Sequence, residues 1–232
     1  MPYHIGTSGF SYKEWKGSFY PEDLPAKQML GYYAGRFTAV EINNTFYRMP
    51  KRELLAGWAA QVPPDFTFVL KAPRRITHSK KLRDAGDDVA YLCDTAAELG
   101  PRLGPILFQL PPYLKRDVSL LDDFLAGVPD GVRAAFEFRS SSWFGDEVYD
   151  VLGRHGAALV AADAGEDHDA PLVATAPFGY ARLRRVEYDA ESLRTWAERL
   201  RAEEWDDTYV FFKHEDAATG PRLAAEFAEL IR

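Results

Sequence analysis

Polar side chains alternate with apolar ones in two short segments of the sequence. Glu41 and Asn43 alternate with valine and isoleucine, and Glu137 and Arg139 alternate with phenylalanine. A period of two places neighbouring side chains on opposite faces of a β-strand. A carboxylate on a buried strand is costly unless it is paired or serves a ligand. These segments therefore indicate strands that carry a polar face into the interior.

Other segments extend this set of polar positions. The carboxyl-terminal ends of the expected strands carry Thr7, Ser8, Glu41, Asn43, Lys71, Gln109, Glu137, Arg139, Asp163, Arg182, Lys213 and His214. Carboxylates and bases gathered in one place perturb one another's pKa values, which suits general acid–base chemistry. From this set we take four candidate catalytic residues, Glu41, Glu137, Lys71 and Asp163, and treat the others as candidate substrate-binding residues. The alternative is a structural network of ion pairs that fills the interior.

Metal binding is a less favoured use of the same residues. The histidines are scattered along the sequence, and His214 is the one beside carboxylates at the end of an expected strand. Together with Glu41, Glu137 and Asp163 it would supply ligands for a divalent ion. The neighbouring lysine and arginine side chains would compete with a cation. We therefore expect no metal and no cofactor, and an anion suits the basic residues better.

Aromatic and basic loops add further candidate substrate-binding residues. Tyr12 and Trp15 lie in an aromatic, glycine-rich loop after the first expected strand, and Trp143 follows the strand that contains Arg139. Aromatic side chains on such loops either stack on a ligand or pack as a lid over the end of the fold. Arg74 belongs to the most basic stretch, residues 74–83, which also contains a histidine at 78. This stretch either contacts phosphate or forms a solvated surface loop.

The elements that position these residues alternate between strands and helices. Short apolar segments predict strands near residues 3–8, 40–43, 66–72, 106–110, 133–139, 157–163, 180–184 and 208–214. Apolar residues at helical spacing lie between most of them, near residues 30–37, 54–59, 89–97, 121–128, 148–152, 193–200 and 223–227. About eight strands alternating with about seven helices indicate a parallel sheet, and a TIM-type (β/α)8 barrel of the α/β class fits best.

Two features refine this prediction of the fold. Residues 164–178 contain glycine, proline and acidic residues without a helical period, so we expect a loop to replace the helix after the sixth strand. An open, doubly wound sheet is the alternative architecture. No glycine-rich phosphate loop follows the first expected strand, which disfavours that alternative.

Length and composition favour one domain over residues 1–232. The sequence is 47% hydrophobic and 27% charged, with a net charge of −7, which argues against a surface built as a whole to hold nucleic acid. The single cysteine, Cys93, excludes a disulfide within the chain. Because the sequence shows neither a signal-like leader nor a run of about 18 apolar residues, we expect a cytoplasmic protein without membrane association.

Several sequence blocks resemble a known family. They are Gly-Thr-Ser-Gly-Phe-Ser-Tyr at 6–12, Val-Glu-Ile-Asn at 40–43, Thr-Phe-Tyr at 45–47, Lys-Ala-Pro at 71–73, Thr-His at 77–78, Gln-Leu-Pro-Pro at 109–112 and Glu-Phe-Arg at 137–139. These blocks resemble the signature of the DUF72, or YecE-like, family over nearly the whole chain. The resemblance implies a TIM-type barrel, and its blocks add Tyr47 and His78 to the candidate substrate-binding residues.

The resemblance also implies a link to nucleic acid, with two qualifications. The barrel of the family is similar to that of endonuclease IV, which suggests nucleic-acid binding or processing. The metal-ligand set of endonuclease IV is not recognisable in this sequence. Where many members have histidine and glycine after an arginine, this chain has Arg-Leu-Arg-Arg at 182–185, and where many have paired asparagines it has Lys-His-Glu-Asp at 213–216. The last two strands are therefore expected to bind a different ligand, or the same ligand differently.

Three functions fit such a barrel. The first is an enzyme that acts on an anionic, phosphorylated or nucleotide-like substrate by general acid–base chemistry. The second is a nucleic-acid-binding module that places basic residues on phosphates and aromatic residues on bases. The third is a glycosidase-like barrel with Glu41 and Glu137 as its carboxylate pair. The expected partner is thus an anionic small molecule or a nucleic acid, and the sequence predicts no oligomeric state.

Overall fold

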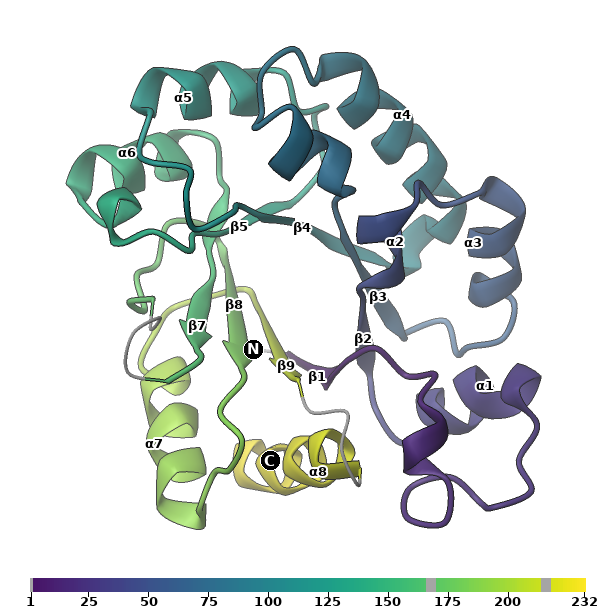
Figure 1. Ribbon diagram of the computed structural model, residues 1–232. Helices are drawn as coiled ribbons and strands as arrows, with labels where there is room; N and C mark the ends of the chain where they lie inside the picture. Colours follow the sequence, from purple (N-terminus) through teal and green to yellow (C-terminus); the bar gives the residue numbers. More distant parts are fainter. Residues whose placement is uncertain (1, 166–169, 214–217) are drawn as a thin grey trace.

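The computed structural model describes residues 2–165, 170–213 and 218–232, and it shows a curled parallel sheet surrounded by helices (Figure 1). The nine strands of the described residues form one sheet in the order β6-β5-β4-β3-β2-β1-β9-β8-β7. Every pairing between them is parallel. The strands are β1 (Tyr3–Ser8), β2 (Ala39–Ile42), β3 (Thr67–Lys71), β4 (Leu103–Gln109), β5 (Ala134–Glu137), β6 (Ala158–Leu159), β7 (Ala161–Asp163), β8 (Phe178–Leu183) and β9 (Asp207–Phe212).

The two ends of this sheet are neighbours in sequence. Only Val160 separates β6 from β7, and β6 pairs with β5 while β7 pairs with β8. The Val160 amide donates to the carbonyl oxygen of Phe136 at 2.9 Å, which holds the junction against β5. The sheet is therefore a nearly closed barrel. The predicted α/β class and parallel barrel are confirmed, with nine strands because the segment expected as one strand over residues 157–163 is divided.

Helices form a ring around the outside of the sheet (Figure 1). They are α1 (Met29–Ala34), α3 (Arg52–Ala59), α4 (Gly86–Ala96), α5 (Val118–Ala126), α6 (Asp146–Arg154), α7 (Ala190–Arg201) and α8 (Thr219–Ile231), with a short α2 (Asn44–Tyr47) after β2. Asp117 and Asp189 cap α5 and α7 by accepting backbone N–H bonds at 3.0 and 2.8 Å. The described residues between β7 and β8 contain no helix, as predicted.

The strand alternation separates an inner from an outer apolar layer. Phe108 and Phe136 point outward and pack against Phe124 of α5, at ring-centre distances of 5.3 and 6.0 Å. The inner layer is a separate buried cluster contributed by most of the strands, and it includes Ala39, Val69, Leu107, Ala135, Tyr180, Tyr209 and Phe211. Because side chains alternate, the residue two positions after an inner one also faces the lumen. This places the polar groups at the strand ends above the inner layer.

The basic stretch, residues 74–83, is more ordered than a solvated surface loop. A π-helical turn, η3, spans Arg75–Ser79, and Ile76 within it is fully buried. Asp88 of α4 pairs with Arg75 and with Lys80, at 2.8 Å in each case. The buried apolar side chain and these ion pairs hold the basic stretch against α4.

Two further features concern membrane-spanning helices and the single cysteine. Within the described ranges, no helix is long and apolar enough to cross a membrane. Cys93 is buried in α4, and burial raises the pKa of its thiol to about 11, so it is a packing residue there.

Candidate functional site

One buried arginine bridges two buried carboxylates inside the barrel. Glu41 lies on β2, Glu137 ends β5 and Arg182 lies on β8, and all three are almost completely inaccessible to solvent. Nη2 of Arg182 donates to Oε1 of Glu41 at 2.8 Å, and its Nη1 donates to Oε2 of Glu137. The predicted convergence of these three residues is confirmed, and so is the outward direction of Phe136 and Phe138, which pack in the outer layer.

Neutral donors complete the surroundings of Glu41. Ser8 Oγ and Asn43 Nδ2 donate to its Oε1 at 2.7 and 3.1 Å, and the Tyr180 hydroxyl donates to its Oε2 at 2.7 Å. Burial alone would raise the pKa of Glu41, but Arg182 and the donated hydrogen bonds outweigh burial and lower it. Burial and the charge of Glu41 in turn raise the pKa of Tyr180 well above 10. Glu41 is thus a fixed anion, and Tyr180 is a fixed donor.

Three arginines surround Glu137. Besides the bond from Arg182, Arg139 Nε donates to its Oε1 at 2.6 Å, and Arg184 Nη1 lies 3.6 Å from the same oxygen. Burial favours the neutral acid, but the positive charges of Arg182, Arg139 and Arg184 hold the pKa of Glu137 well below its usual range. Glu137 therefore acts as a counter-ion and is poorly suited to deliver a proton near neutral pH.

Lys71, at the end of β3, has mostly neutral partners. Its Nζ donates to Oε1 of Gln109 at 2.7 Å and lies 4.3 Å from the centre of the Phe46 ring. Among the described residues, no carboxylate forms an ion pair with it. Burial, followed by the charge of Arg182, lowers the pKa of Lys71 to about 8. Lys71 therefore exchanges protons close to neutral pH, which the two glutamates do not.

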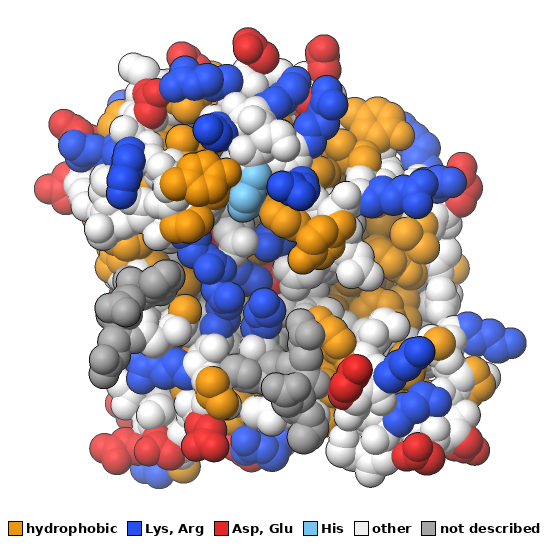
Figure 2. Space-filling model, viewed as in Figure 1, with side chains coloured by type: hydrophobic (Ala, Val, Ile, Leu, Met, Phe, Trp, Pro, Cys, Tyr) orange, Lys and Arg blue, Asp and Glu red, His pale blue; other side chains and the backbone are white. Residues whose placement is uncertain are grey.

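Arg184 presents buried donors that lack acceptors. It follows β8, and its side chain is 17% exposed. Its Nε and Nη1 atoms are buried and donate no hydrogen bond to the described part of the chain. Such donors are expensive to leave unsatisfied, which favours an anion at this position. Figure 2 shows lysine and arginine side chains gathered at the hollowed centre of this face of the barrel.

Asp163 does not join this group. Its Oδ2 accepts a hydrogen bond from Trp196 Nε1 of α7 at 2.8 Å, and its Oδ1 accepts one from Arg185 Nε. Within β7, Asp163 shares the outward face with Ala161, which belongs to the outer apolar layer. The prediction that Asp163 lines the same cavity as Glu41 is therefore wrong, because the expected strand is divided at Val160 and Asp163 faces α7.

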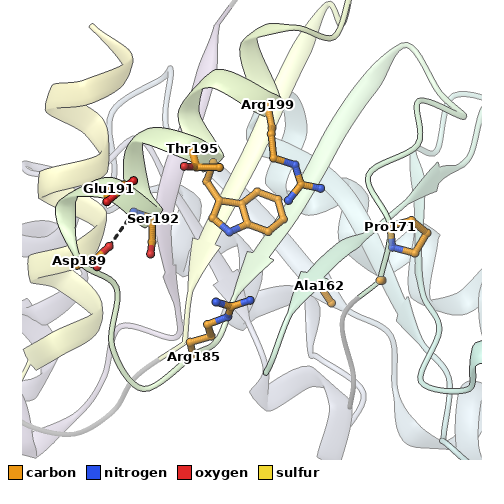
Figure 3. Close-up of a pocket in the computed structure, with 10 residues that line it drawn as sticks. Ala162, Pro171, Arg185, Asp189, Glu191, Ser192, Thr195 and Arg199 are labelled. Atoms are coloured by element: carbon orange, nitrogen blue, oxygen red, sulfur yellow. Dashed lines mark hydrogen bonds between the residues drawn. The ribbon is translucent and has the colours of Figure 1, made fainter. Parts of the chain in front are cut away.

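A separate cavity of about 640 Å³ is lined by α7 together with Ala162, Arg185 and residues 170–171 (Figure 3). Three of its four charged side chains have protein partners among the described residues. Arg185 binds Asp163, Asp189 caps α7, and the Arg199 guanidinium lies 4.3 Å from the centre of the Trp196 ring. Since its lining shows no buried donor without an acceptor in the described ranges, the barrel mouth is the better candidate site despite the size of this cavity.

Three of the candidate substrate-binding residues, Trp15, Trp143 and Thr7, pack inside the protein instead of facing the mouth. Trp15 and Trp143 are completely buried, and Trp143 stacks on Phe138 at 4.7 Å between ring centres. Thr7 Oγ1 donates to the carbonyl oxygen of Gly9 at 2.6 Å and lies 2.9 Å from the Tyr33 hydroxyl, on the helix side of the sheet. These placements favour the lid interpretation of the aromatic loop and remove the two tryptophans as stacking surfaces.

The remaining candidates lie around the mouth or at the surface. His78 is half-buried, its ring meets Phe46 edge-on at 4.9 Å, and burial followed by the charges of Lys71 and Arg74 lowers its pKa. Tyr12 is half-buried and donates to the Ser8 carbonyl oxygen at 2.7 Å. Arg74 and Tyr47 are exposed to solvent. Lys213, the residue that follows β9, is half-buried. His214 lies outside the described residues.

Sequence reasoning missed three residues of the mouth. Tyr180 and Arg184 flank Arg182 at a spacing of two, so the alternation that identified Arg182 also predicts a shared face for them. Phe46 carries no such signal, because it lies in α2 and reaches Lys71 through the tertiary fold.

The sequence matches a known protein family over nearly its whole length. Residues 4–232 match the family model described as "Protein of unknown function DUF72". The chain belongs to the DUF72 family. Two bacterial relatives are UPF0759 protein YecE of Escherichia coli (strain K12), 28% identical over 231 residues with 86% of this chain and 84% of YecE covered, and UPF0759 protein YunF of Bacillus subtilis (strain 168), 27% identical over 156 residues with 63% and 54% covered.

Solved structures of DUF72 proteins share the fold. The DUF72 protein TM1631 of Thermotoga maritima MSB8 superposes with a TM-score of 0.88 at 29% identity, with 100% of this chain and 99% of that chain covered. The DUF72 protein EF0366 of Enterococcus faecalis V583 gives a TM-score of 0.78 at 18% identity, covering 99% and 97%. At that lower identity the likeness speaks for the fold alone.

Proposed function

We propose that this DUF72 protein is an enzyme that binds an anionic, phosphorylated substrate at the mouth of a TIM-type barrel. The observation that carries the proposal is Arg184, whose buried Nε and Nη1 lack acceptors among the described residues. A phosphate offers several acceptor oxygens to the planar fork of an arginine. In barrels of the TIM type, chemistry takes place at the carboxyl-terminal ends of the strands, where Arg184 lies.

The charges of the mouth support the same ligand class. Four bases, Lys71, Arg139, Arg182 and Arg184, meet two carboxylates, Glu41 and Glu137, in the described part of the mouth. Arg182 is held between both carboxylates. The excess of positive charge therefore falls on Arg139, Arg184 and Lys71, and it lies in a chain with a net charge of −7. A local basic site of this kind attracts an anion.

Lys71 is the acid–base group that the geometry favours. With a pKa of about 8, it is partly unprotonated near neutral pH and can accept a proton from a bound substrate. Arg139 and Arg184 would stabilise negative charge that develops during that step. The two glutamates, first considered as catalytic candidates, serve in this proposal to hold Arg182 and to stay ionised.

The alternative functions have less support. A nucleic-acid module that stacks bases on Trp15 and Trp143 conflicts with their complete burial. A glycosidase needs one carboxylic acid with a raised pKa, whereas the pKa values of both Glu41 and Glu137 are lowered.

The test compares Arg184→Met with the control Arg154→Met, which changes an exposed arginine on α6. Melting curves are measured with inorganic phosphate, with a panel of phosphomonoesters and with the corresponding alcohols. We expect phosphomonoesters, and not the alcohols, to raise the melting temperature of the wild type and of Arg154→Met, with binding at least about tenfold weaker in Arg184→Met, as for a lost charged hydrogen bond. Equal binding by Arg184→Met would contradict the proposal.

The same variants give a second readout without ligand. Removing buried donors that lack acceptors relieves a cost, so Arg184→Met is expected to melt at the same temperature as the wild type or higher. A large fall in the melting temperature of the unliganded variant would show that Arg184 is structural.

A further inference from the structure

The amine of Lys71 is held by neutral groups on two sides. The Gln109 amide oxygen accepts its hydrogen bond at 2.7 Å, and the face of Phe46 lies 4.3 Å away. Neither partner carries a negative charge that would fix the ammonium form. Burial and the positive charge of Arg182 disfavour the ammonium form and outweigh the opposing charges of Glu41 and Glu137, so the pKa of Lys71 is lowered. A lysine in such surroundings retains a nucleophilic free amine, the property used by Schiff-base lysines.

His78, a candidate proton-transfer group, contacts the same aromatic ring as this amine. The ring of His78 packs edge-on against the same Phe46, with 4.9 Å between ring centres, and its Nδ1 lies 2.9 Å from Thr77 Oγ1. Burial and the charges of Lys71, Arg74 and Arg139 keep its imidazole neutral near pH 7. A neutral imidazole accepts and returns protons, which the formation of an imine requires.

We propose that Lys71 is a nucleophile that forms a Schiff base with a phosphorylated aldehyde or ketone. This inference rests on the proposed function, because Arg139 and Arg184 would hold the phosphate while the carbonyl carbon approaches Nζ. It narrows the proposed substrate from any phosphorylated anion to one that also carries an aldehyde or ketone group.

The step balances without a further reactant. The Nζ lone pair forms a bond to the carbonyl carbon, the C=O π pair moves to the oxygen, and the proton lost from nitrogen is returned to that oxygen with His78 as the carrier. The resulting carbinolamine loses its hydroxyl group and one nitrogen proton as water, which leaves a C=N bond whose nitrogen takes up a proton from solvent. Nothing is oxidised or reduced. The protonated imine then withdraws electrons from a neighbouring C–H or C–C bond, which is the chemistry such a residue makes accessible.

The experiment traps the imine by reduction. Wild type is incubated with glyceraldehyde 3-phosphate or with glyceraldehyde in the presence of sodium cyanoborohydride, and the adducts are located by peptide mass spectrometry. We expect a single reduced adduct on Lys71 that forms at least tenfold faster with the phosphorylated aldehyde. Lys71→Arg should show no adduct at this position, and Lys27→Arg, which changes an exposed lysine, should label as the wild type does.

The outcomes separate the two proposals. If phosphomonoesters stabilise the wild type and Lys71→Arg alike while Lys71 gains no adduct, the Schiff base is overturned and anion binding stands. If Lys71 is labelled equally fast by both aldehydes, and Arg184→Met does not slow either, the nucleophile stands and the phosphorylated substrate is overturned. Because the adduct is mapped in the wild type, the result does not depend on the folding of Lys71→Arg.

Discussion

A single guanidinium sets the protonation of the barrel mouth. Arg182 lowers the pKa values of Glu41 and Glu137 and also contributes to lowering that of Lys71. The two glutamates outweigh burial and raise the pKa of Arg182 in return. Glu41, Glu137 and Arg182 therefore stay charged near neutral pH, whereas the amine of Lys71 can gain or lose a proton. Because buried ion pairs seldom add net stability, this arrangement is better explained by the position and charge it gives to the neighbouring groups.

Glu137→Gln tests whether the carboxylate is a structural counter-ion. The substitution keeps the shape of the side chain but leaves Arg139, Arg182 and Arg184 with one negative charge fewer. We expect the free energy of unfolding to fall by about 3 to 5 kcal/mol, as when one partner of a buried pair is removed. Urea unfolding at neutral pH measures the change, with Glu147→Gln on the exposed surface of α6 as the control. Unchanged or raised stability would instead assign Glu137 to ligand chemistry.

Lys71→Met tests the lowered pKa of Lys71 through the pH dependence of stability. The folded pKa is about 8 and the ordinary value is 10.5, so between these values the unfolded chain binds more protons than the folded chain. Wild-type stability therefore rises with pH across that window, and the cost of the buried ammonium is fully present below pH 8. We expect Lys71→Met to be more stable than the wild type at pH 7, by on the order of 2 kcal/mol.

The measurement is the difference in unfolding free energy between wild type and Lys71→Met at pH 7 and pH 10. The advantage of the variant should shrink as the pH rises. Lys27→Met serves as the control, and its difference from the wild type should stay constant. An advantage that grows with pH would show that the folded protein stabilises the ammonium.

At the scale of strands and helices, alternation predicted most of the site. The period of two correctly turned Glu41, Glu137 and Arg182 inward, because each flanks apolar residues that the outer helices bury. It failed at Asp163, where the division of the strand at Val160 and the partners on α7 arise only in the folded barrel. The fold class was accessible because strand and helix patterns are local, whereas strand closure depends on contacts between distant segments.

Loop side chains were less predictable than strand side chains. Trp143 lies in a short 3-10 turn, Ser141–Trp143, where no periodicity indicates which way a ring points. Its burial depends on Phe138 and on the Leu114 carbonyl oxygen, which accepts its indole N–H at 2.8 Å. The sequence therefore identified Trp143 as an aromatic residue near the mouth. Only the tertiary fold shows that its ring is buried behind the mouth and does not face a ligand.

Gly6→Ala tests the close approach of β1 and β2. A Cβ atom at Gly6 would lie 1.9 Å from the backbone oxygen of Ala39, its partner in the sheet, and 2.7 Å from the Tyr33 hydroxyl. A backbone atom cannot move aside without separating the two strands, so we expect a loss of about 3 kcal/mol or more. Thermal unfolding measures it.

Gly57→Ala is the matched control. Gly57 lies in the exposed middle of α3, and a Cβ atom there would meet nothing within 4 Å. Alanine is favoured over glycine inside a helix, so this variant should gain about 0.5 to 1 kcal/mol. Equal melting of the two variants would mean that β1 and β2 are not as close as described.

At the scale of the whole molecule, the two ends of the barrel differ in how their polar groups are satisfied. The mouth carries excess bases and buried donors without acceptors in the described ranges. At the other end, Asp207 accepts from Arg133 at 2.8 Å and contacts His4 Nε2 at 3.2 Å, while His4 Nδ1 lies 3.2 Å from Thr67 Oγ1. The ring of His4 also stacks on Tyr209 at 4.6 Å. In barrels of the TIM type, the carboxyl-terminal end is expected to carry out the chemistry and the amino-terminal end to stabilise the fold.

The pH dependence of His4→Gln tests this stabilising end. Burial lowers the pKa of His4 from 6.5 despite the opposing effect of Asp207, so the contact between them is a hydrogen bond of a neutral ring. The folded chain resists a proton that the unfolded chain takes up as the pH falls through 6.5, so the contribution of His4 is present above that pH and is lost below it. At pH 7.5 we expect His4→Gln to cost about 1 to 2 kcal/mol for its lost hydrogen bonds and stacking. The difference between wild type and variant, measured by urea unfolding, should then narrow towards pH 5. If it widens instead, His4 is protonated and paired with Asp207, and the amino-terminal end of the barrel is held by charge.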